Sequence, residues 1–195
     1  NSAAQERCVT LKDYENRVLM MPARYGAPFR VSAVEENNKV MLYLLGIDNN
    51  GKLSDKIPTL MVANIENYLS MYRTLNDFVE IKNGRIINIS IEMDVFISKA
   101  YSTADVLAEV NEKIANYMDI SKHELGEDIF VGDIEKEVGN VDGVLNVIET
   151  RVYNEFGELY SKTMSTQLTT GDWLSGQAQI DLEASQYILN SEPDE

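Results

Sequence analysis

The sequence predicts an α/β protein of the α+β kind, with two small ferredoxin-like sandwiches in tandem and an extended C-terminal arm. Two observations predict this fold class. Apolar, mostly β-branched residues recur at every second position over residues 85–98, which is typical of a strand with one buried face. Segments with apolar residues at helical spacing alternate with such strands, so we expect sheets that are covered by helices.

The first sandwich is expected over residues 1–83, in the order helix, strand, strand, helix, strand. Thr10-Leu-Lys-Asp13 resembles a capping box with Asp in place of the usual Glu, and it predicts the start of the first helix. Residues 28–35 alternate, whereas residues 40–47 are almost continuously apolar, as expected of a central strand covered on both faces. Asp48-Asn-Asn-Gly-Lys predicts a hairpin-like turn after that strand.

The second sandwich is expected over residues 84–154, after a turn at Asn83-Gly84. It begins with the alternating strand. The helix that follows is opened by Ser102-Thr-Ala-Asp105, which also resembles a capping box. The apolar stripe expected to face the core consists of Val106, Val110, Ile114 and Tyr117, widened by Leu107 and Met118.

A shorter helix over residues 132–138 and a closing strand over residues 144–152 complete the second sandwich. Gly139 stands where a left-handed helix cap is needed, and Asn140-Val-Asp-Gly143 predicts the turn into the closing strand. The glycines therefore have backbone roles, since they form no phosphate-binding pattern.

Residues 155–195 are predicted to form the extended arm, because residues 161–179 are rich in Ser, Thr, Gly and Gln. Short strands are predicted at residues 180–183 and 187–190. The arm packs either on the body of this chain or on a neighbouring subunit, and the sequence leaves both open. The residues predicted as interface anchors are Trp173, Leu174, Tyr187, Ile188 and Leu189.

Composition excludes several classes of partner. The formal net charge of -15 leaves no basic stripe for nucleic acid, and it disfavours an anionic membrane surface. It fits a soluble protein or one that docks onto a basic partner. The single cysteine, Cys8, permits no internal disulfide and suits a reducing compartment. Since the chain begins at Asn1 without an initiator Met, we expect it to be a piece of a longer polypeptide.

No group of residues predicts catalysis, a cofactor or a metal ion. His123 is the only histidine and is expected on a solvated loop among acidic residues. Cys8 is expected to be a half-buried structural thiol. The turn at Asp48 resembles part of a calcium loop but has Thr59 where the distal Glu would stand. The sequence therefore predicts that the protein is not an enzyme.

Four motifs, in order, suggest a family. They are Arg7-Cys-Val-Thr-x-x-Asp-Tyr14, Tyr68-Leu-x-x-Tyr-Arg73 followed by Val79, Ile86-Ile-Asn-Ile-x-Ile91, and Gly139-Asn-Val-Asp-Gly-Val144. Over residues 4–153 the chain resembles the C-terminal region of tailed-phage baseplate wedge proteins of the J-like family. The Arg-Cys-Val-Thr form and the long arm resemble most the members from T-even-like contractile phages.

This resemblance implies a structural protein that forms part of the tail baseplate of the virion. During assembly the protein is expected in the host cytoplasm. Its implied partners are a second copy of itself, as a homodimer, and other baseplate wedge subunits around the tail tube. It implies no nucleic acid, membrane or small-molecule substrate as partner, and no cofactor. The alternative is a small-molecule-binding regulatory module built on paired ferredoxin-like domains, which rests on fold-level analogy.

Overall fold

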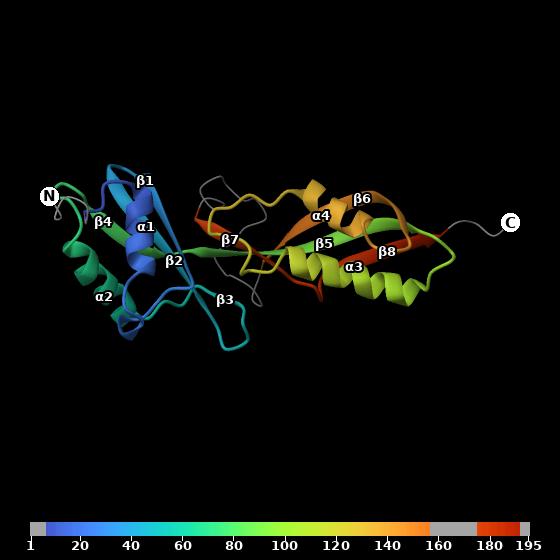
Figure 1. Cartoon of the computed structure of the whole chain (residues 1–195), viewed down its shortest axis with the longest axis horizontal. Helices are drawn as coiled ribbons and strands as arrows, with labels where there is room; N and C mark the ends of the chain where they lie inside the picture. The colour runs from blue at the N-terminus through green and yellow to red at the C-terminus, as the bar shows by residue number, and fades with distance from the viewer. Residues whose placement is uncertain (1–6, 157–174, 192–195) are drawn as a thin grey trace. The chain divides into compact units, whose positions relative to one another are not determined.

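The computed structural model describes residues 7–156 and 175–191, and confirms the mixed α+β class. The elements are α1 (Leu11–Leu19), the 3-10 helix η1 (Ala23–Tyr25), β1 (Arg30–Glu36), β2 (Lys39–Ile47), β3 (Leu53–Ser54), α2 (Thr59–Ser70), β4 (Val79–Asn83), β5 (Arg85–Ile97), α3 (Thr103–Tyr117), α4 (Val131–Gly139), β6 (Val144–Glu155), β7 (Gly176–Ile180) and β8 (Gln186–Ser191). Figure 1 labels them along the chain. The described residues divide into two compact units, 7–86 with 175–177 and 87–156 with 178–191.

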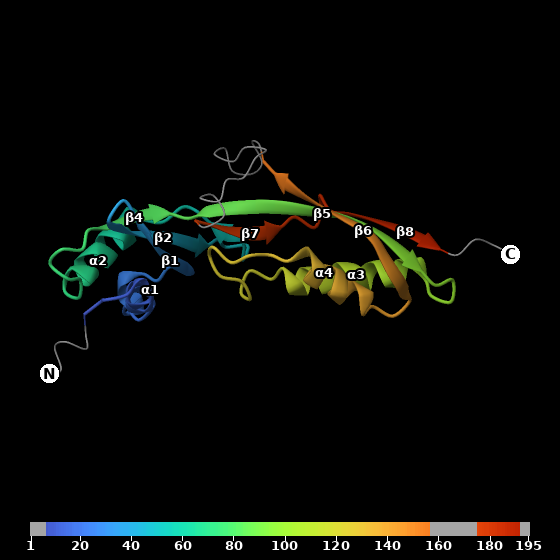
Figure 2. The same ribbon diagram turned by 90° about the horizontal axis from the view of Figure 1, so that it is seen from above.

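In the first unit β2 is the central strand. It pairs antiparallel with β1 and β3 and parallel with β4. Helices α1 and α2 pack on one face of this sheet, where Tyr14 and Val18 of α1 meet Leu42 and Leu44 of β2 (Figure 2). Met41 and Leu45, on the opposite face of the strand, are buried as well. The prediction of a central strand covered on both faces is therefore confirmed.

The start of α1 is the capping box that the sequence predicts. Thr10 Oγ1 accepts a hydrogen bond from the Asp13 N–H at 3.2 Å, and Asp13 Oδ2 accepts one from the Thr10 N–H at 2.7 Å. These backbone donors at Thr10 and Val9 hold the pKa of the Asp13 carboxyl below its usual value. Two orphan N–H groups of the helix end are satisfied in this way.

In the second unit β5 is the central strand. It pairs antiparallel with β6 on one side, and on the other with β7 and, in parallel, β8. The buried side chains at every second position of β5 are Ile87, Ile89, Ile91, Met93, Val95 and Ile97. Helices α3 and α4 cover this face, with Val106, Val110 and Ile134 among their buried residues (Figure 2). The predicted alternation is thus confirmed.

The described part of residues 155–195 joins the chain's own second sheet. Strand β8 matches the strand predicted at residues 187–190. The strand predicted at residues 180–183 is wrong, because β7 ends at Ile180 and a turn follows over residues 182–184. The ferredoxin-like detail is not confirmed, because the sheets run β1-β2-β3 with β4 beside β2, and β6-β5-β7 with β8 beside β5. The boundaries predicted at residues 83 and 154 stay a prediction.

Several local predictions are wrong at the level of single residues. Asn83-Gly84 makes no hairpin, because β4 pairs with β2 and β5 pairs with β6. Ser102 caps α3 by position, but its side chain makes no capping hydrogen bond. Leu107 is 38% exposed and lies outside the buried stripe, whereas Met118 is buried as predicted.

The glycine predicted as a left-handed cap is also misplaced. Gly139 lies inside α4 and Asn140 caps the helix with φ -87°. The positive φ falls instead at Gly143, at +91°, where a Cβ would lie 2.7 Å from Cγ of Tyr101. Only glycine fits this turn, because both the backbone conformation and the neighbouring ring exclude a side chain.

Candidate interaction surface

His123 is buried, so the prediction of a solvated loop is wrong. Its Nε2 donates to the backbone carbonyl of Tyr117 at 2.7 Å, and its Nδ1 lies 3.3 Å from Glu127 Oε1. The ring packs edge-on against Tyr117. A histidine whose two nitrogens have partners can be buried at the end of α3 without an unsatisfied group. This arrangement holds the loop between α3 and α4 in place.

The other two polar candidates also have structural roles. Cys8 is fully buried, and burial raises the pKa of its thiol, opposed by the nearby Arg17. Asp48 Oδ1 accepts from the N–H groups of Asn50 and Lys52 at 2.8 and 2.9 Å, which confirms the hairpin turn between β2 and β3. Among residues 7–156 and 175–191, no group of three or more His, Cys, Asp or Glu could hold a metal ion.

Several exposed apolar side chains of the second unit follow β6. Within the described residues β6 pairs with β5 alone, so its outer edge has no strand partner. We call the β6 edge the set of exposed apolar residues on and just after this strand, namely Leu145, Ile148, Val152, Tyr153 and Phe156. Exposed apolar edge strands are typical sites for contact with another chain.

Two bulges explain why β6 exposes apolar residues. Asp94 pairs with Glu149 but Val95 pairs with Val147, so Ile148 has no opposite residue and is 55% exposed. Leu145 is displaced in the same way and is 52% exposed. A bulge re-aims side chains and interrupts edge pairing, so these two residues project at the rim of the sheet.

Sequence reasoning missed this edge, although a signal was present. The closing segment has adjacent apolar pairs, Val144-Leu145 and Val147-Ile148, repeated after three residues. Neighbouring residues of a regular strand face opposite sides, so both members of a pair cannot enter the core. The break in the period of two marks the bulges.

The sheet face opposite α3 and α4 carries an ion-pair network around Arg151. Its Nη2 lies 2.7 Å from Glu92 Oε1 and 3.2 Å from Asp94 Oδ1, and Nη1 bonds Glu149. The hydrogen bond that Arg151 donates to Glu92, followed by the one it donates to Glu149, raises the pKa of Arg151. One guanidinium therefore holds three carboxylates on one face of the sheet.

The predicted anchors of the arm are divided between the two faces of β8. Tyr187 and Leu189 are half-buried on the helix side, opposite Met93 and Val95, and Ile188 is exposed on the other face. The hydroxyl of Tyr187 donates to Asn111 Oδ1 of α3 at 3.4 Å, and burial raises its pKa. Trp173 and Leu174 lie outside the described residues, so the anchor assignment stays a prediction.

None of the described helices combines the length and the apolar character that a membrane span requires. Comparison with models of known protein families and with curated proteins finds no match.

Comparison with solved structures finds a similar fold. A chain in the cryo-electron microscopy structure of the anti-feeding prophage baseplate, 6-fold symmetrised, matches with a TM-score of 0.62 and 12% sequence identity. The match covers 91% of this chain and 38% of that chain. A share of 91% must include residues of both units. At this identity the likeness shows a shared fold, and the present chain corresponds to well under half of the baseplate chain.

Proposed function

We propose that this chain is a structural component of a baseplate, which joins subunits through the exposed surfaces of its second unit. The observation that carries the proposal is the fold similarity to a baseplate chain over 91% of the present chain. The order of the four sequence motifs supports the same assignment. The finer assignment, to the J-like wedge proteins of a contractile tailed phage, is part of this proposal.

The β6 edge supports a role in contacts between proteins. The apolar side chains of Leu145 and Ile148 are exposed to solvent. They lie on β6, which pairs with only one other strand, β5, among the described residues. Pairing of an edge strand with another chain satisfies its backbone groups and buries such side chains together. We propose that the partners are a second copy of this chain and other baseplate wedge subunits.

The proposed role is non-enzymatic and needs no cofactor. Burial raises the pKa of the Cys8 thiol, and His123 and Asp48 are engaged in holding loops. The proposed location is the virion tail baseplate, with the host cytoplasm as the place of assembly. Nucleic acid, membranes and small-molecule substrates are not among the proposed partners.

Sedimentation velocity over a range of concentrations tests the proposal. The chain should form dimers, and Ile148→Lys and Leu145→Lys should each shift it to monomer, because a lysine on an edge strand opposes pairing. Leu75→Lys, at an exposed leucine of the first unit, is the matched control and should leave the dimer unchanged. A second assay measures co-purification of the chain with baseplate wedge subunits expressed together with it. A strict monomer at high concentration that also captures no wedge subunit contradicts the proposal.

A further inference from the structure

The outer side of α3 carries two adjacent stripes. The inner side of the helix is buried through Val106, Val110 and Ile114. The first outer stripe lines a groove of about 370 Å³ beside β8, formed by Ala104, Leu107, Ala108, Asn111 and Tyr187; we call it the α3 groove. The second lines a hollow of about 440 Å³, formed by Asp105, Ala108, Glu109, Glu112, Lys113 and Asn116. Ala108 belongs to both, so the two stripes form one continuous surface.

The α3 groove is suited to close approach by another helix. Ala104 and Ala108 stand one turn apart and present only methyl groups, while Leu107 exposes a larger apolar side chain. The ring of Tyr187 forms the wall on the β8 side and is held by its hydrogen bond to Asn111. From Ala104 to Asn116 the helix rises about 18 Å, which matches roughly three turns of a partner helix.

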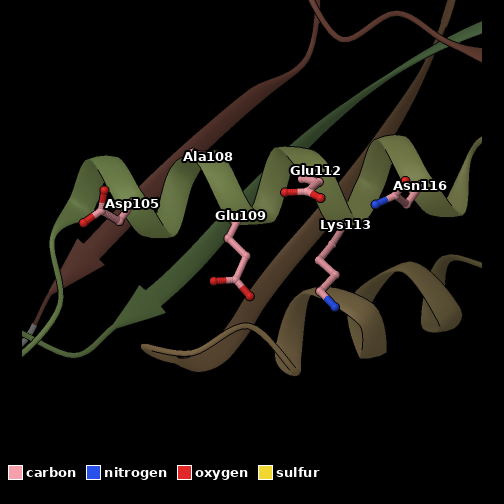
Figure 3. A pocket seen from close by; sticks show the side chains of 6 residues that line it. All are labelled: Asp105, Ala108, Glu109, Glu112, Lys113 and Asn116. Atoms are coloured by element: carbon pink, nitrogen blue, oxygen red, sulfur yellow. The ribbon is translucent and has the colours of Figure 1, made fainter.

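The second stripe gives this surface a negative charge. Its carboxylates Asp105, Glu109 and Glu112, here called the acidic stripe, line the same face of α3, and Figure 3 shows Glu109 and Lys113 extending toward α4. None of the three carboxylates forms an ion pair with another described residue. Their charge is therefore available to a partner, and among the six residues that line the hollow Lys113 alone is a cation.

The charge of the surrounding chain acts in the same direction. Residues 87–195 contain 22 Asp and Glu but 6 Lys and Arg, whereas residues 1–86 contain 10 and 11; together these make the chain's 32 and 17. A strongly negative surface attracts basic partners over a distance set by the ionic strength. The apolar groove and the negative charge thus favour one kind of ligand, a helix with an apolar side and a basic side.

We propose that the outer face of α3 docks a basic amphipathic helix of another protein. The apolar side of that helix lies in the α3 groove, and its Lys or Arg residues face the acidic stripe. This is the helix-in-groove form of recognition, with affinity from apolar contact and partner choice from charge. The inference rests on the proposed function in taking the partner to be another baseplate subunit, but it uses a surface separate from the β6 edge.

The test uses the full chain and a designed helical peptide with one leucine face and one Lys/Arg face, labelled for fluorescence anisotropy. The chain should bind this peptide, and a peptide with glutamates in place of the basic residues should not bind. The triple variant Asp105→Asn, Glu109→Gln, Glu112→Gln should weaken binding by about tenfold or more, and added salt should reduce the difference. Ala108→Arg should abolish binding because it fills the groove and reverses the local charge.

A matched control separates docking on α3 from general attraction to an acidic protein. The triple variant Glu135→Gln, Glu137→Gln, Glu183→Gln removes the same charge from α4 and from the turn before β8, and should weaken binding by less than about threefold. Equal losses in the two triple variants, or unchanged binding in Ala108→Arg, overturn the inference.

Self-association distinguishes this inference from the proposed function. Sedimentation of Ala108→Arg should match that of the wild type, because the β6 edge is intact in this variant. If Ala108→Arg dissociates the dimer, the occupant of the groove is a second copy of the chain and the inference is wrong. If peptide binding behaves as expected while the chain is a monomer that captures no wedge subunit, the inference stands and the proposed function fails.

Discussion

The two units are built on one plan and differ in their surfaces. Each has a sheet with a long apolar central strand, β2 or β5, and two helices on one face. Yet residues 87–195 carry a net charge of -16 and residues 1–86 a net charge of +1, which together make the chain's -15. Net charge governs solubility and association more than fold. The difference is consistent with the proposal that the second unit docks a basic partner.

The units also place their polar groups differently. In the first unit a polar contact lies at the core, where the hydroxyl of buried Tyr14 donates to Asp77 Oδ2 at 2.5 Å. In the second unit the buried face of β5 is wholly aliphatic apart from Met93, and its main ion-pair network lies on the opposite face around Arg151. The stability of the two units should accordingly respond to different changes.

The largest effects are expected from the two cores. Ile65→Ala in α2 and Ile114→Ala in α3 each remove a fully buried side chain, and each should lower the free energy of unfolding by about 2–5 kcal/mol. Urea denaturation measures the loss, and hydrogen exchange with mass spectrometry locates it. Exchange should rise in the first unit for Ile65→Ala and in the second for Ile114→Ala. An equal rise in exchange throughout the chain in both variants would contradict the division into two units.

A smaller effect is expected for the polar contact of the first unit. Tyr14→Phe should cost about 1–3 kcal/mol, because it leaves the Asp77 carboxylate without this donor. Tyr25→Phe, at an exposed ring, is the control and should change little.

This contact also predicts a dependence on pH. Burial, followed by the hydrogen bond to Asp77, raises the pKa of Tyr14 above its ordinary value of 10.0. Its contribution is then present below pH 10.0 and is lost as the pH rises further, since the unfolded state releases the proton first. The stability of the wild type should fall toward that of Tyr14→Phe in alkaline urea titrations. A difference that grows above this pH would contradict the assignment.

The helix starts give a sharper comparison between the units. Thr10→Ala should destabilise the first unit by about 1 kcal/mol, because its hydroxyl caps α1. Ser102→Ala should change the stability of the second unit by less than about 0.5 kcal/mol, because its hydroxyl makes no capping bond. Urea midpoints at constant slope measure both, and equal losses would show that Ser102 caps α3 after all.

The smallest effect is expected at Arg151. Arg151→Met leaves Glu92, Asp94 and Glu149 close together without their cation, so the variant should be slightly less stable than the wild type at neutral pH. The difference should shrink with added salt, because salt screens the charges of exposed groups. Thermal unfolding across a range of salt concentrations tests this, with Arg24→Met as the control in the first unit. A difference that is insensitive to salt would assign Arg151 a packing role.

The sequence predicted best where one local cause decides the structure. Local sequence alone determines three of these features, namely the period of two in β5, the apolar run of β2 and the capping box at Thr10. It failed where a particular contact outside the repeating pattern decides: the place of Gly143 depends on the ring of Tyr101, and the burial of His123 depends on the carbonyl of Tyr117. Strand order likewise depends on long-range pairing, which periodicity does not contain.

The candidate surfaces follow the same division. Tyr187 and Ile188 were predicted as anchors from their apolar character in a polar arm, but the β6 edge was missed because its exposure results from bulges. Leu107 was assigned to the core because it stands next to the buried stripe in the helical pattern, whereas the structure places it at the rim of the α3 groove. Periodicity identifies the buried face of a helix better than it identifies the edge of that face.

The central claim, that the second unit meets neighbouring subunits, is tested most directly by hydrogen exchange of the chain at low and high concentration. Protection should increase in β6 when the chain associates, and the increase should vanish in Ile148→Lys. The edge strands of the first unit, β1 and β4, should exchange at the same rate at both concentrations. Protection gained only in β1 or β4, or no gain anywhere while the chain stays a monomer, would contradict the account.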